Sequence, residues 1–381
     1  MFDYEFLKLI WWVIIGFILV IYAATAGFDA GVTMYMPFLK SETDRRVVLN
    51  TSAPTWDGNL TWLVFAGGGL FVVWPVVYST AFSGMYAAIL LILFSMFLRP
   101  PGYEYRNKID NNAWRKMWDW ALFISGIVPV FVFGVAIGNC FVGFPFHFDP
   151  NTYRAFYTGY FWQLLNPCGL LAGIVSVLMV LMHGSVYLQR RTEGSIRALA
   201  RRVHFTTALI LLVAFTSTGL LLMYHIDGYQ LISSAANPTL EPLKNVVHQG
   251  IGLWVASFSM YPWKYLPPVL AYAAIIESLW AAYYGWYTTA FWASCFAVGG
   301  IVVTAGTALF PFLMPSSTNP NESITVWNAA SSQYALNVML YIGVILLIII
   351  LGYKIFAYNT IWGKKSTLTS EDLEKNNHHF Y

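Results

Sequence analysis

The chain contains few charged residues. Only 10% of its 381 residues are Asp, Glu, Lys or Arg, whereas 58% are hydrophobic. Soluble domains carry about 25% charged residues. This composition excludes an ordinary soluble domain and indicates a membrane protein with several spanning helices.

Several motifs of soluble enzymes and binding proteins are also missing. The sequence has no phosphate-binding loop, dinucleotide-binding fingerprint, nucleophile elbow or zinc motif, and no nucleic-acid-binding signature. Its three cysteines, Cys140, Cys168 and Cys295, form no CxxC pair, so we interpret them as small apolar residues within helices. The first residues, Met1 to Glu5, are acidic rather than basic, and we therefore predict that the N-terminus is retained rather than cleaved as a signal.

Long apolar segments dominate the rest of the chain. A membrane span needs roughly 20 apolar residues, and windows of that size predict nine spans. Their approximate bounds are 8–38, 59–77, 80–98, 118–142, 160–188, 204–224, 265–284, 289–313 and 335–358. Pro75 and the Gly67–Gly69 run predict a break and a tight turn near Tyr78, between the second and third spans. The long loops after the fourth and sixth spans are rich in Pro, Asn and aromatic residues, and we expect them to be ordered.

The basic residues predict the orientation. With nine spans, 17 of the 21 lysines and arginines fall on the side that holds the C-terminus. The positive-inside rule then places the N-terminus outside and the C-terminus in the cytoplasm. We predict an all-α integral membrane protein with two four-helix bundles and one extra helix. It would form one polytopic domain, residues 1–381, with a first half at 1–189 and a second half with a cytoplasmic tail at 190–381.

Two aspartates are the most informative residues. Asp29 interrupts the first apolar run and Asp57 opens the second. An ionisable group at membrane depth is costly and is a functional hypothesis by default. Asp29 suits a proton relay, and Gly27 and Gly31 on either side would let another helix approach closely; the alternative is a structural acid bonded to a neighbouring helix. Asp57 also suits the N-terminus of a helix, where a carboxylate satisfies free N–H groups.

Three further positions extend this pattern. Glu104 and Lys108 lie in the loop on the same side as Asp57, and together they could collect protons, although such clusters are more often only solvated loops. Trp62 lies one turn beyond Asp57 and could line an apolar passage, or could simply pack between helices.

His183 and His204 lie at similar depth on consecutive antiparallel spans, so a bis-histidine haem site is geometrically conceivable. The alternative is that both are neutral histidines near the headgroup region. Glu277, within the seventh span, could be buried and paired or could extend to the membrane surface.

A set of long motifs, in order along the whole chain, resembles subunit II of the cytochrome bd-type quinol oxidases, in its long form. The motifs are Gly27-Phe28-Asp29-Ala30-Gly31, Trp56-Asp57-Gly58-Asn59 with Trp62, Ala81-Phe82-Ser83-Gly84, Phe97-Leu98-Arg99-Pro100, Gln163-Leu164-Leu165-Asn166-Pro167, Gly169-Leu170-Leu171-Ala172-Gly173, Thr304-Ala305-Gly306, Phe310-Pro311-Phe312, Met314-Pro315-Ser316-Ser317, Ser331-Ser332-Gln333 and the terminal Tyr381.

The resemblance implies a multi-pass subunit of the bacterial inner membrane. The enzyme would oxidise ubiquinol or menaquinol, reduce oxygen to water and contribute to the proton-motive force. Two b-type haems and haem d would be bound by subunit I, and none would be ligated by this chain. The resemblance leaves open a small single-span accessory subunit and a bound structural quinone or lipid, and it implies no catalytic or metal-binding residue here.

The resemblance also implies residue roles. Asp57, Glu104, Lys108 and Tyr381 match positions associated with the proton path, and Asp29 matches a membrane acid associated with a second proton route. Trp62 matches the start of the oxygen channel. The chain departs from close relatives at Ala26, where they can have a second acid, and at Glu104, where aspartate is usual. His183, His204 and Glu277 match no functional position of the family.

Two other functions remain compatible with the residues alone. Buried acids and interrupted helices (Gly67–Gly69, Pro129, Pro167) would also suit an ion-coupled secondary transporter. A scaffold subunit without any proton role is the third.

Overall fold

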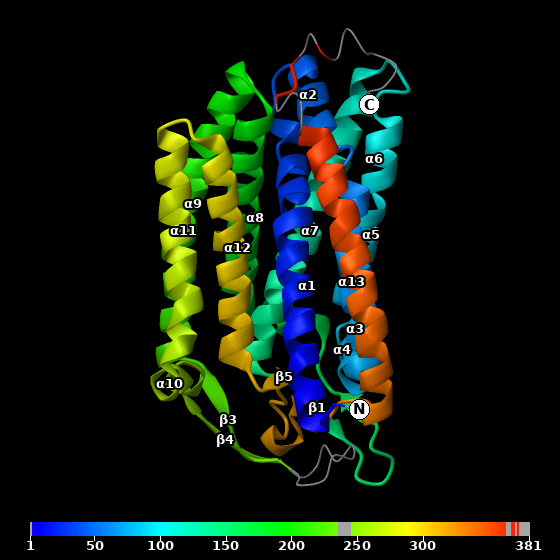
Figure 1. Ribbon diagram of the computed structural model, residues 1–381, viewed down its shortest axis with the longest axis vertical. Coiled ribbons are helices and arrows are strands. Elements are labelled where there is room, and N and C mark those ends of the chain that lie inside the picture. Colours follow the sequence, from blue (N-terminus) through cyan, green and yellow to red (C-terminus); the bar gives the residue numbers. More distant parts are fainter. Residues whose placement is uncertain (1, 235–244, 363–366, 370–371, 373–381) are drawn as a thin grey trace.

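Thirteen α-helices make up most of the computed structural model, which describes residues 2–234, 245–362, 367–369 and 372 (Figure 1). The helices are α1 (Tyr4–Thr33), α2 (Glu42–Ser52), α3 (Trp56–Val73), α4 (Pro75–Gly84), α5 (Tyr86–Phe97), α6 (Arg99–Tyr105), α7 (Asn112–Val142), α8 (Pro167–Arg191), α9 (Gly194–Tyr224), α10 (Leu253–Met260), α11 (Leu266–Tyr283), α12 (Tyr287–Leu309) and α13 (Gln333–Trp362). Short 3-10 helices are η1 (Met36–Phe38), η2 (Phe161–Leu165), η4 (Pro262–Tyr265) and η5 (Pro320–Glu322).

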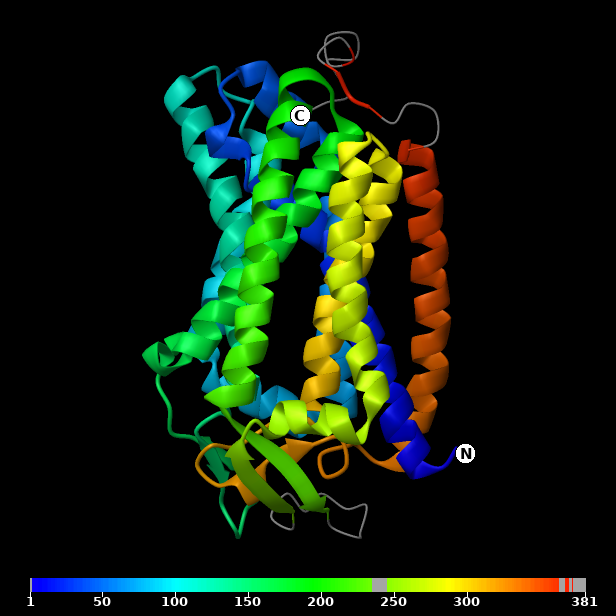
Figure 2. The same ribbon diagram turned by 90° about the vertical axis from the view of Figure 1, so that its left-hand side faces the viewer.

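Three small antiparallel hairpins complete the described structure. Their strands are β1 (Phe146–Phe148) with β2 (Ala155–Tyr157), β3 (Asp227–Ser233) with β4 (Val246–Ile251), and β5 (Phe312–Met314) with β6 (Ile324–Thr325). All lie at the end of the molecule where α1 begins, drawn at the bottom of Figures 1 and 2 and here named the lower end. The loops expected to be ordered therefore contain the first two hairpins, with residues 235–244 outside the described part.

The described part of the structure gives eight or nine candidate spans where nine were predicted, and their bounds agree only in part. Within the described residues, eight helices are long and apolar enough to cross a membrane, and α3 with α4 makes a ninth if the pair is counted as one bent span. The break predicted near Tyr78 lies earlier, at Trp74, where α3 and α4 meet at 116°. Pro75 explains the position, because proline donates no N–H and disfavours helical geometry in the residue before it. The three glycines at 67–69 stay helical.

Three other predicted spans also differ at one end. The sixth was expected from residue 204, but α9 begins at Gly194. The fifth was expected from residue 160, but α8 begins at Pro167, where the Asn166 side chain accepts a hydrogen bond from the Gly169 N–H at 2.8 Å. An asparagine cap followed by proline is a strong helix start. The eighth was expected to reach residue 313, but α12 ends at Leu309 and the chain continues into β5.

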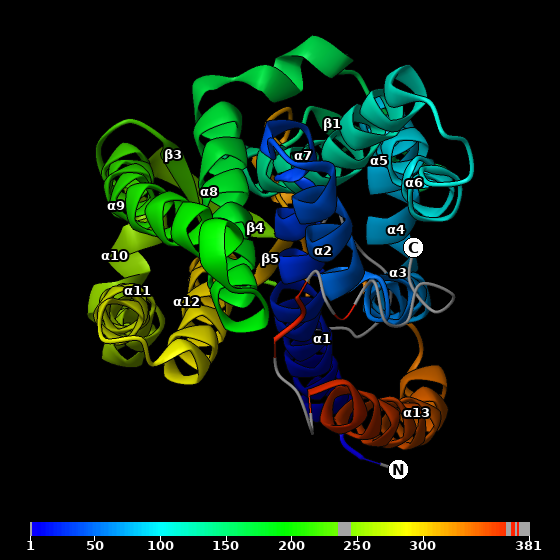
Figure 3. The ribbon, with the colours of Figure 1, turned by 90° about the horizontal axis from the view of Figure 1, so that it is seen from above.

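Helix α1 occupies the centre of the bundle. It contacts α3, α7, α8, α12 and α13, and the view from above shows these helices around it, with α13 at the periphery (Figure 3). The α1–α8 contact is closest at Gly31, because a Cβ added to Gly184 of α8 would lie 2.7 Å from the Gly31 Cα. Gly27 is less constrained, since its added Cβ would be 3.7 Å from Val180. The predicted close approach of a helix is confirmed, and Gly31 is the residue that permits it.

Candidate functional site

Asp29 is the centre of a buried polar cluster near the end of α1. Its side chain is only 1% exposed. Its Oδ1 accepts a hydrogen bond from the Thr55 hydroxyl at 2.8 Å, and its Oδ2 accepts one from the Asn59 Nδ2 at 2.6 Å. Both donors belong to the start of α3, where a spacing of four residues puts them on the same helix face. The α1–α3 contact thus provides a carboxyl group that is enclosed and yet hydrogen bonded at both oxygens.

Helix α13 supplies the other side of the cluster. The Lys354 Nζ donates to the Asn59 Oδ1 at 2.8 Å, and the Tyr358 hydroxyl donates to the same oxygen at 2.9 Å. Lys354 is 8% exposed and interacts electrostatically with both Asp29 and Asp57. The side-chain amide of Asn59 therefore connects the buried Lys354 to the buried Asp29 through two hydrogen bonds.

Asp57 is exposed in the first turn of α3, two residues after Thr55. Within the described residues its carboxylate makes no hydrogen bond or ion pair, although its charge acts on Lys354. The alternative interpretation is seen in part: Asp57 is an acid in the first turn of α3, where the helix dipole favours negative charge, but the N-cap is Thr55 and no side chain caps that end. Asp57 thus lies on the exposed side of the same turn that contacts Asp29.

Glu104 and Lys108 are both exposed, and no contact among the described residues joins either of them to Asp57. Tyr103, the residue before Glu104, faces inward. Tyr103 is buried, its hydroxyl is 2.7 Å from the Ser52 Oγ, and its ring stacks on Trp56 at 5.2 Å between centroids. The three predicted residues are therefore separate on the surface, while Tyr103 brings the Glu104 segment to the α2–α3 turn. Tyr381 lies outside the described residues.

Trp62 is fully buried one turn below Asn59. It packs in an apolar cluster with Ile18 of α1 and Ala66 of α3, and its indole N–H has no hydrogen-bond partner in the described part of the chain. Its surroundings are apolar, as an oxygen passage would need, and also fit ordinary helix packing.

A second charged cluster was not expected from the sequence. The buried Arg106 guanidinium contacts Asp119 at 2.6 Å and Glu42 at 2.7 Å. Burial alone would raise the pKa of Glu42, but hydrogen bonds from Arg106 and the charges of Arg106, Arg115 and Arg45 lower it overall. This network ties α2 and the end of α6 to α7, and nothing in it resembles a chain of exchangeable protons, because three of its members are arginines.

Neither candidate haem ligand presents a free ring nitrogen. His183 contacts the Ser294 Oγ and the Ala24 carbonyl oxygen, each at 2.7 Å. His204 contacts the Gln189 Nε2 and the Ser278 Oγ, each at 3.2 Å. A bis-histidine haem site would require breaking these bonds, so the residues do not fit that group. Glu277 is exposed on α11.

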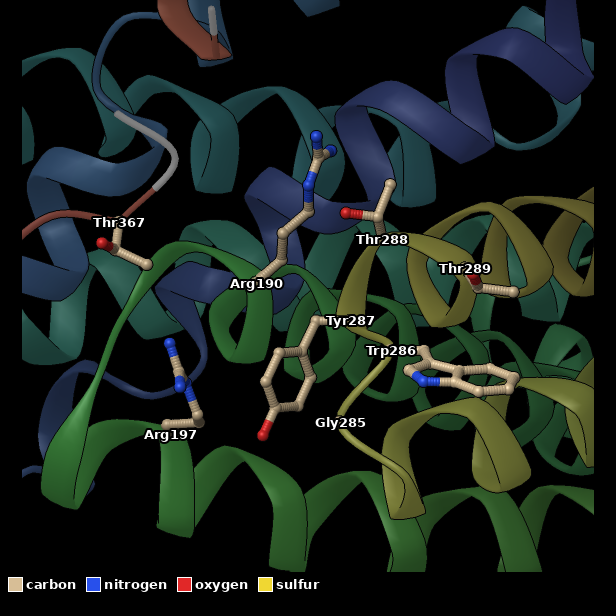
Figure 4. Close-up of a pocket in the computed structure, with 8 residues that line it drawn as sticks. All are labelled: Arg190, Arg197, Gly285, Trp286, Tyr287, Thr288, Thr289 and Thr367. Carbon is tan, nitrogen blue, oxygen red and sulfur yellow. The ribbon is translucent and has the colours of Figure 1, made fainter. Parts of the chain in front are cut away.

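A pocket of about 380 Å³ lies between the α8–α9 turn and the start of α12, and Asp29 is not among its lining residues (Figure 4). Its lining residues are Arg190, Arg197, Gly285, Trp286, Tyr287, Thr288, Thr289 and Thr367. The charged side chains in this lining are both arginines, so the local potential is positive and disfavours protons. We therefore do not place a proton entrance there.

Lys354, Tyr358, Thr55 and Asn59 were not selected as site residues from the sequence. Lys354 carried a usable signal, because a lone lysine in the long apolar run of α13 is an ionisable group at membrane depth. The sequence interpretation counted it only as a basic residue near the inner end of its span. Thr55 and Asn59 carried no such signal, since their role depends on a contact with a residue about 30 positions away.

Comparisons with known proteins agree on one family. Residues 7–361 match the family model described as "Cytochrome bd terminal oxidase subunit II". The chain is 45% identical, over the full length of both chains, to the cytochrome bd-I ubiquinol oxidase subunit 2 of Escherichia coli. It is 41% identical, again over both full lengths, to the probable cytochrome oxidase subunit 2 of Haemophilus influenzae.

The fold agrees as well. A chain in the structure of the bd oxidase from Geobacillus thermodenitrificans matches with a TM-score of 0.67 at 16% identity, covering 94% of this chain and 99% of that one. A match at such low identity supports the fold alone. The family is shown by the family model and by the two full-length relatives. The chain belongs to the cytochrome bd terminal oxidase subunit II family.

Proposed function

We propose that this chain is the subunit of a bd-type quinol oxidase that carries protons to the oxygen-reducing haems of subunit I. The enzyme would oxidise ubiquinol or menaquinol and reduce oxygen to water in the bacterial inner membrane. The 45% sequence identity to the Escherichia coli subunit, over the full length of both chains, supports this function over an ion-coupled transporter. The two b-type haems and haem d would belong to subunit I, in keeping with the occupied ring nitrogens of His183 and His204.

The orientation and helix grouping are part of the proposal. The bias of basic residues would put the lower end in the periplasm and the opposite, upper end in the cytoplasm. Contacts of α8 with α9 and α12, and of α11 with α9 and α12, suggest one four-helix group, with α1, α3, α5 and α7 as the other and α13 as the extra helix. Division of the chain into halves at 189/190 stays a prediction, as do an accessory subunit and a bound quinone or lipid.

The single observation behind the proton role is that the start of α3 presents an exposed acid, Asp57, and also contacts a buried acid, Asp29. Asp57 faces outward, and Thr55, two residues earlier, donates to the buried Asp29. Protons need polar stations, because an isolated charge in hydrocarbon costs several kcal/mol. In this proposal Asp57, Glu104, Lys108 and Tyr381 collect protons at the cytoplasmic surface, and Asp29 is a station within the membrane.

Substitution of the exposed residues tests the proposal. We expect Asp57→Asn and Glu104→Gln to slow quinol-driven oxygen uptake by about a hundredfold, the lower end of the range for loss of a proton-transfer group. The haem spectrum should stay intact, because neither side chain has a structural partner in the described residues. Asp110→Asn is a matched control, since Asp110 is an exposed acid on the same surface. Full oxygen uptake in both variants, with haems assembled, would support a scaffold subunit instead.

Trp62 leads to a separate test. If it lines the oxygen passage, Trp62→Phe should change the rate constant of oxygen binding and leave the KM for quinol unchanged, because a smaller ring widens an apolar path. Trp74→Phe serves as the control, since Trp74 is equally buried but lies at the α3–α4 break. Equal, small effects of both changes would assign Trp62 to packing only.

A further inference from the structure

Lys354 is a buried cation for which the proposed proton path has no role. It lies on α13, with its ammonium against Gly58; a Cβ added there would be 3.1 Å from the Lys354 Nζ. In the described residues it makes no ion pair, and its hydrogen-bond acceptor is the Asn59 Oδ1. Desolvating an ammonium is costly, so a lysine kept there without a carboxylate contact points to a role for its charge or its N–H groups.

Hydrogen-bond chemistry fixes the orientation of the Asn59 amide. A lysine ammonium can only donate, so the group facing it must be the amide oxygen. The amide NH₂ then faces α1, where it lies 2.6 Å from the Asp29 Oδ2 and 3.3 Å from the Thr25 carbonyl oxygen. The Asp29 Oδ2 therefore accepts from an amide N–H group that cannot accept in return, so a proton placed on Oδ2 would find no acceptor in Asn59.

The other carboxylate oxygen has a different environment. The Asp29 Oδ1 is 2.8 Å from the Thr55 Oγ1, and that hydroxyl is also 3.0 Å from the Ser52 carbonyl oxygen. A hydroxyl carries one proton and can accept as well as donate. When Asp29 is ionised, Thr55 donates to Oδ1; when Oδ1 is protonated, it can donate to Thr55, which then donates to Ser52. Rotation of one hydroxyl therefore accommodates both protonation states.

We propose that Lys354 is a positioning residue of the proton path, which locks the Asn59 amide so that Asp29 gains and loses its proton only at Oδ1. This oxygen faces the α2–α3 turn, and Asp57 follows two residues after Thr55. The step is one proton bound at Oδ1 and one released from it, with no change of oxidation state. The inference rests on the proposed function, because it gives Lys354 a role only if Asp29 carries protons.

Several further groups face Asp29 from the surrounding elements. Besides Lys354, its charge interacts with Tyr358 of α13, Arg99 and Tyr103 of α6, and Tyr187 of α8. Arg99 is the other cation, and its Nη2 donates to the Ser125 carbonyl oxygen at 2.7 Å. Among these groups, Lys354 and Tyr358 are the ones that contact the Asn59 oxygen, so the orientation of this amide depends on α13.

Proton uptake during a single turnover of the assembled oxidase tests this role. Lys354→Met removes the donor, and we expect uptake to slow about tenfold or more, as for loss of a hydrogen bond to a charged group. Lys354→Gln keeps an N–H donor without the charge and should restore part of the rate. Lys264→Met is the control, because Lys264 is also buried but its Nζ bonds Ser257 far from Asp29.

A double substitution separates positioning from a general structural effect. If Lys354 acts through Asp29, Lys354→Met should cause no further slowing in the Asp29→Asn background. If Lys354→Met slows uptake equally in both backgrounds, or leaves it unchanged while Asp29→Asn slows it, the positioning role is wrong and the proton path stands. If Asp29→Asn itself has no effect, the Asp29 part of the proposed function fails, and the inference falls with it.

Discussion

The contact between α1 and α8 predicts opposite effects for two glycines one turn apart. Alanine at either Gly27 or Gly31 should gain up to about 1 kcal/mol of helix propensity. At Gly27 the new methyl group would meet side-chain atoms at 3.7 and 3.9 Å, which is ordinary van der Waals contact. At Gly31 it would overlap the Val180 carbonyl oxygen and lie 2.9 Å from the Gly184 Cα. These are backbone atoms, which no rotamer change can move.

Overpacking of this kind costs about 1–3 kcal/mol. We therefore expect Gly31→Ala to lower the free energy of unfolding by about 1–2 kcal/mol, after the propensity gain, and Gly27→Ala to leave it unchanged or raise it slightly. Unfolding of the purified complex in mixed micelles, followed by tryptophan fluorescence, measures both. Gly184→Ala should resemble Gly31→Ala. Equal stability of the two α1 variants would refute the close approach of the helices at Gly31.

The charged cluster around Arg106 yields two further predictions. Arg106→Met should destabilise the protein by about 3–5 kcal/mol, because the buried Asp119 loses its 2.6 Å contact and keeps only Arg45 at 3.5 Å. Arg115→Met, which loses a pair with the exposed Asp110, should cost about 0–1 kcal/mol in the same unfolding assay. The pKa of Glu42 is lowered in the folded state, so its carboxylate stabilises the fold only where it is ionised. The difference in unfolding free energy between the wild type and Glu42→Gln should therefore be constant well above pH 4.5 and shrink as the pH falls below that value. A difference that grows at low pH would contradict the direction of this pKa shift.

The apolar pattern could predict the helices, since a span is a local property of about 20 residues. The apolar pattern predicted helix bounds poorly where a helix is bent or capped. The change of direction at Trp74 depends on Pro75, and the start of α8 depends on the Asn166 cap. Both signals are present in the sequence, but hydropathy is insensitive to them. The three glycines at 67–69 were overinterpreted as a break, because glycine weakens a helix without preventing it.

The candidate site was predictable in its acids and not in their partners. Asp29 stands out because an acid in an apolar run is costly. Its bonds to Thr55 and Asn59, and the approach of Lys354 from α13, are tertiary contacts without sequence periodicity. The burial of Arg106 could not be predicted for a similar reason. Several basic residues lie near it in the sequence, and only the fold determines which of them is buried.

Proton uptake by the reconstituted oxidase tests the central claim most directly. A fully reduced complex in liposomes would be mixed with oxygen, and a pH dye on the cytoplasmic side would follow uptake during a single turnover. We predict that Asp57→Asn and Asp29→Asn delay proton uptake together with oxygen reduction, while electron transfer from quinol to the first haem keeps its wild-type rate. Wild-type rates of uptake in both variants would show that protons reach the oxygen site without these two acids.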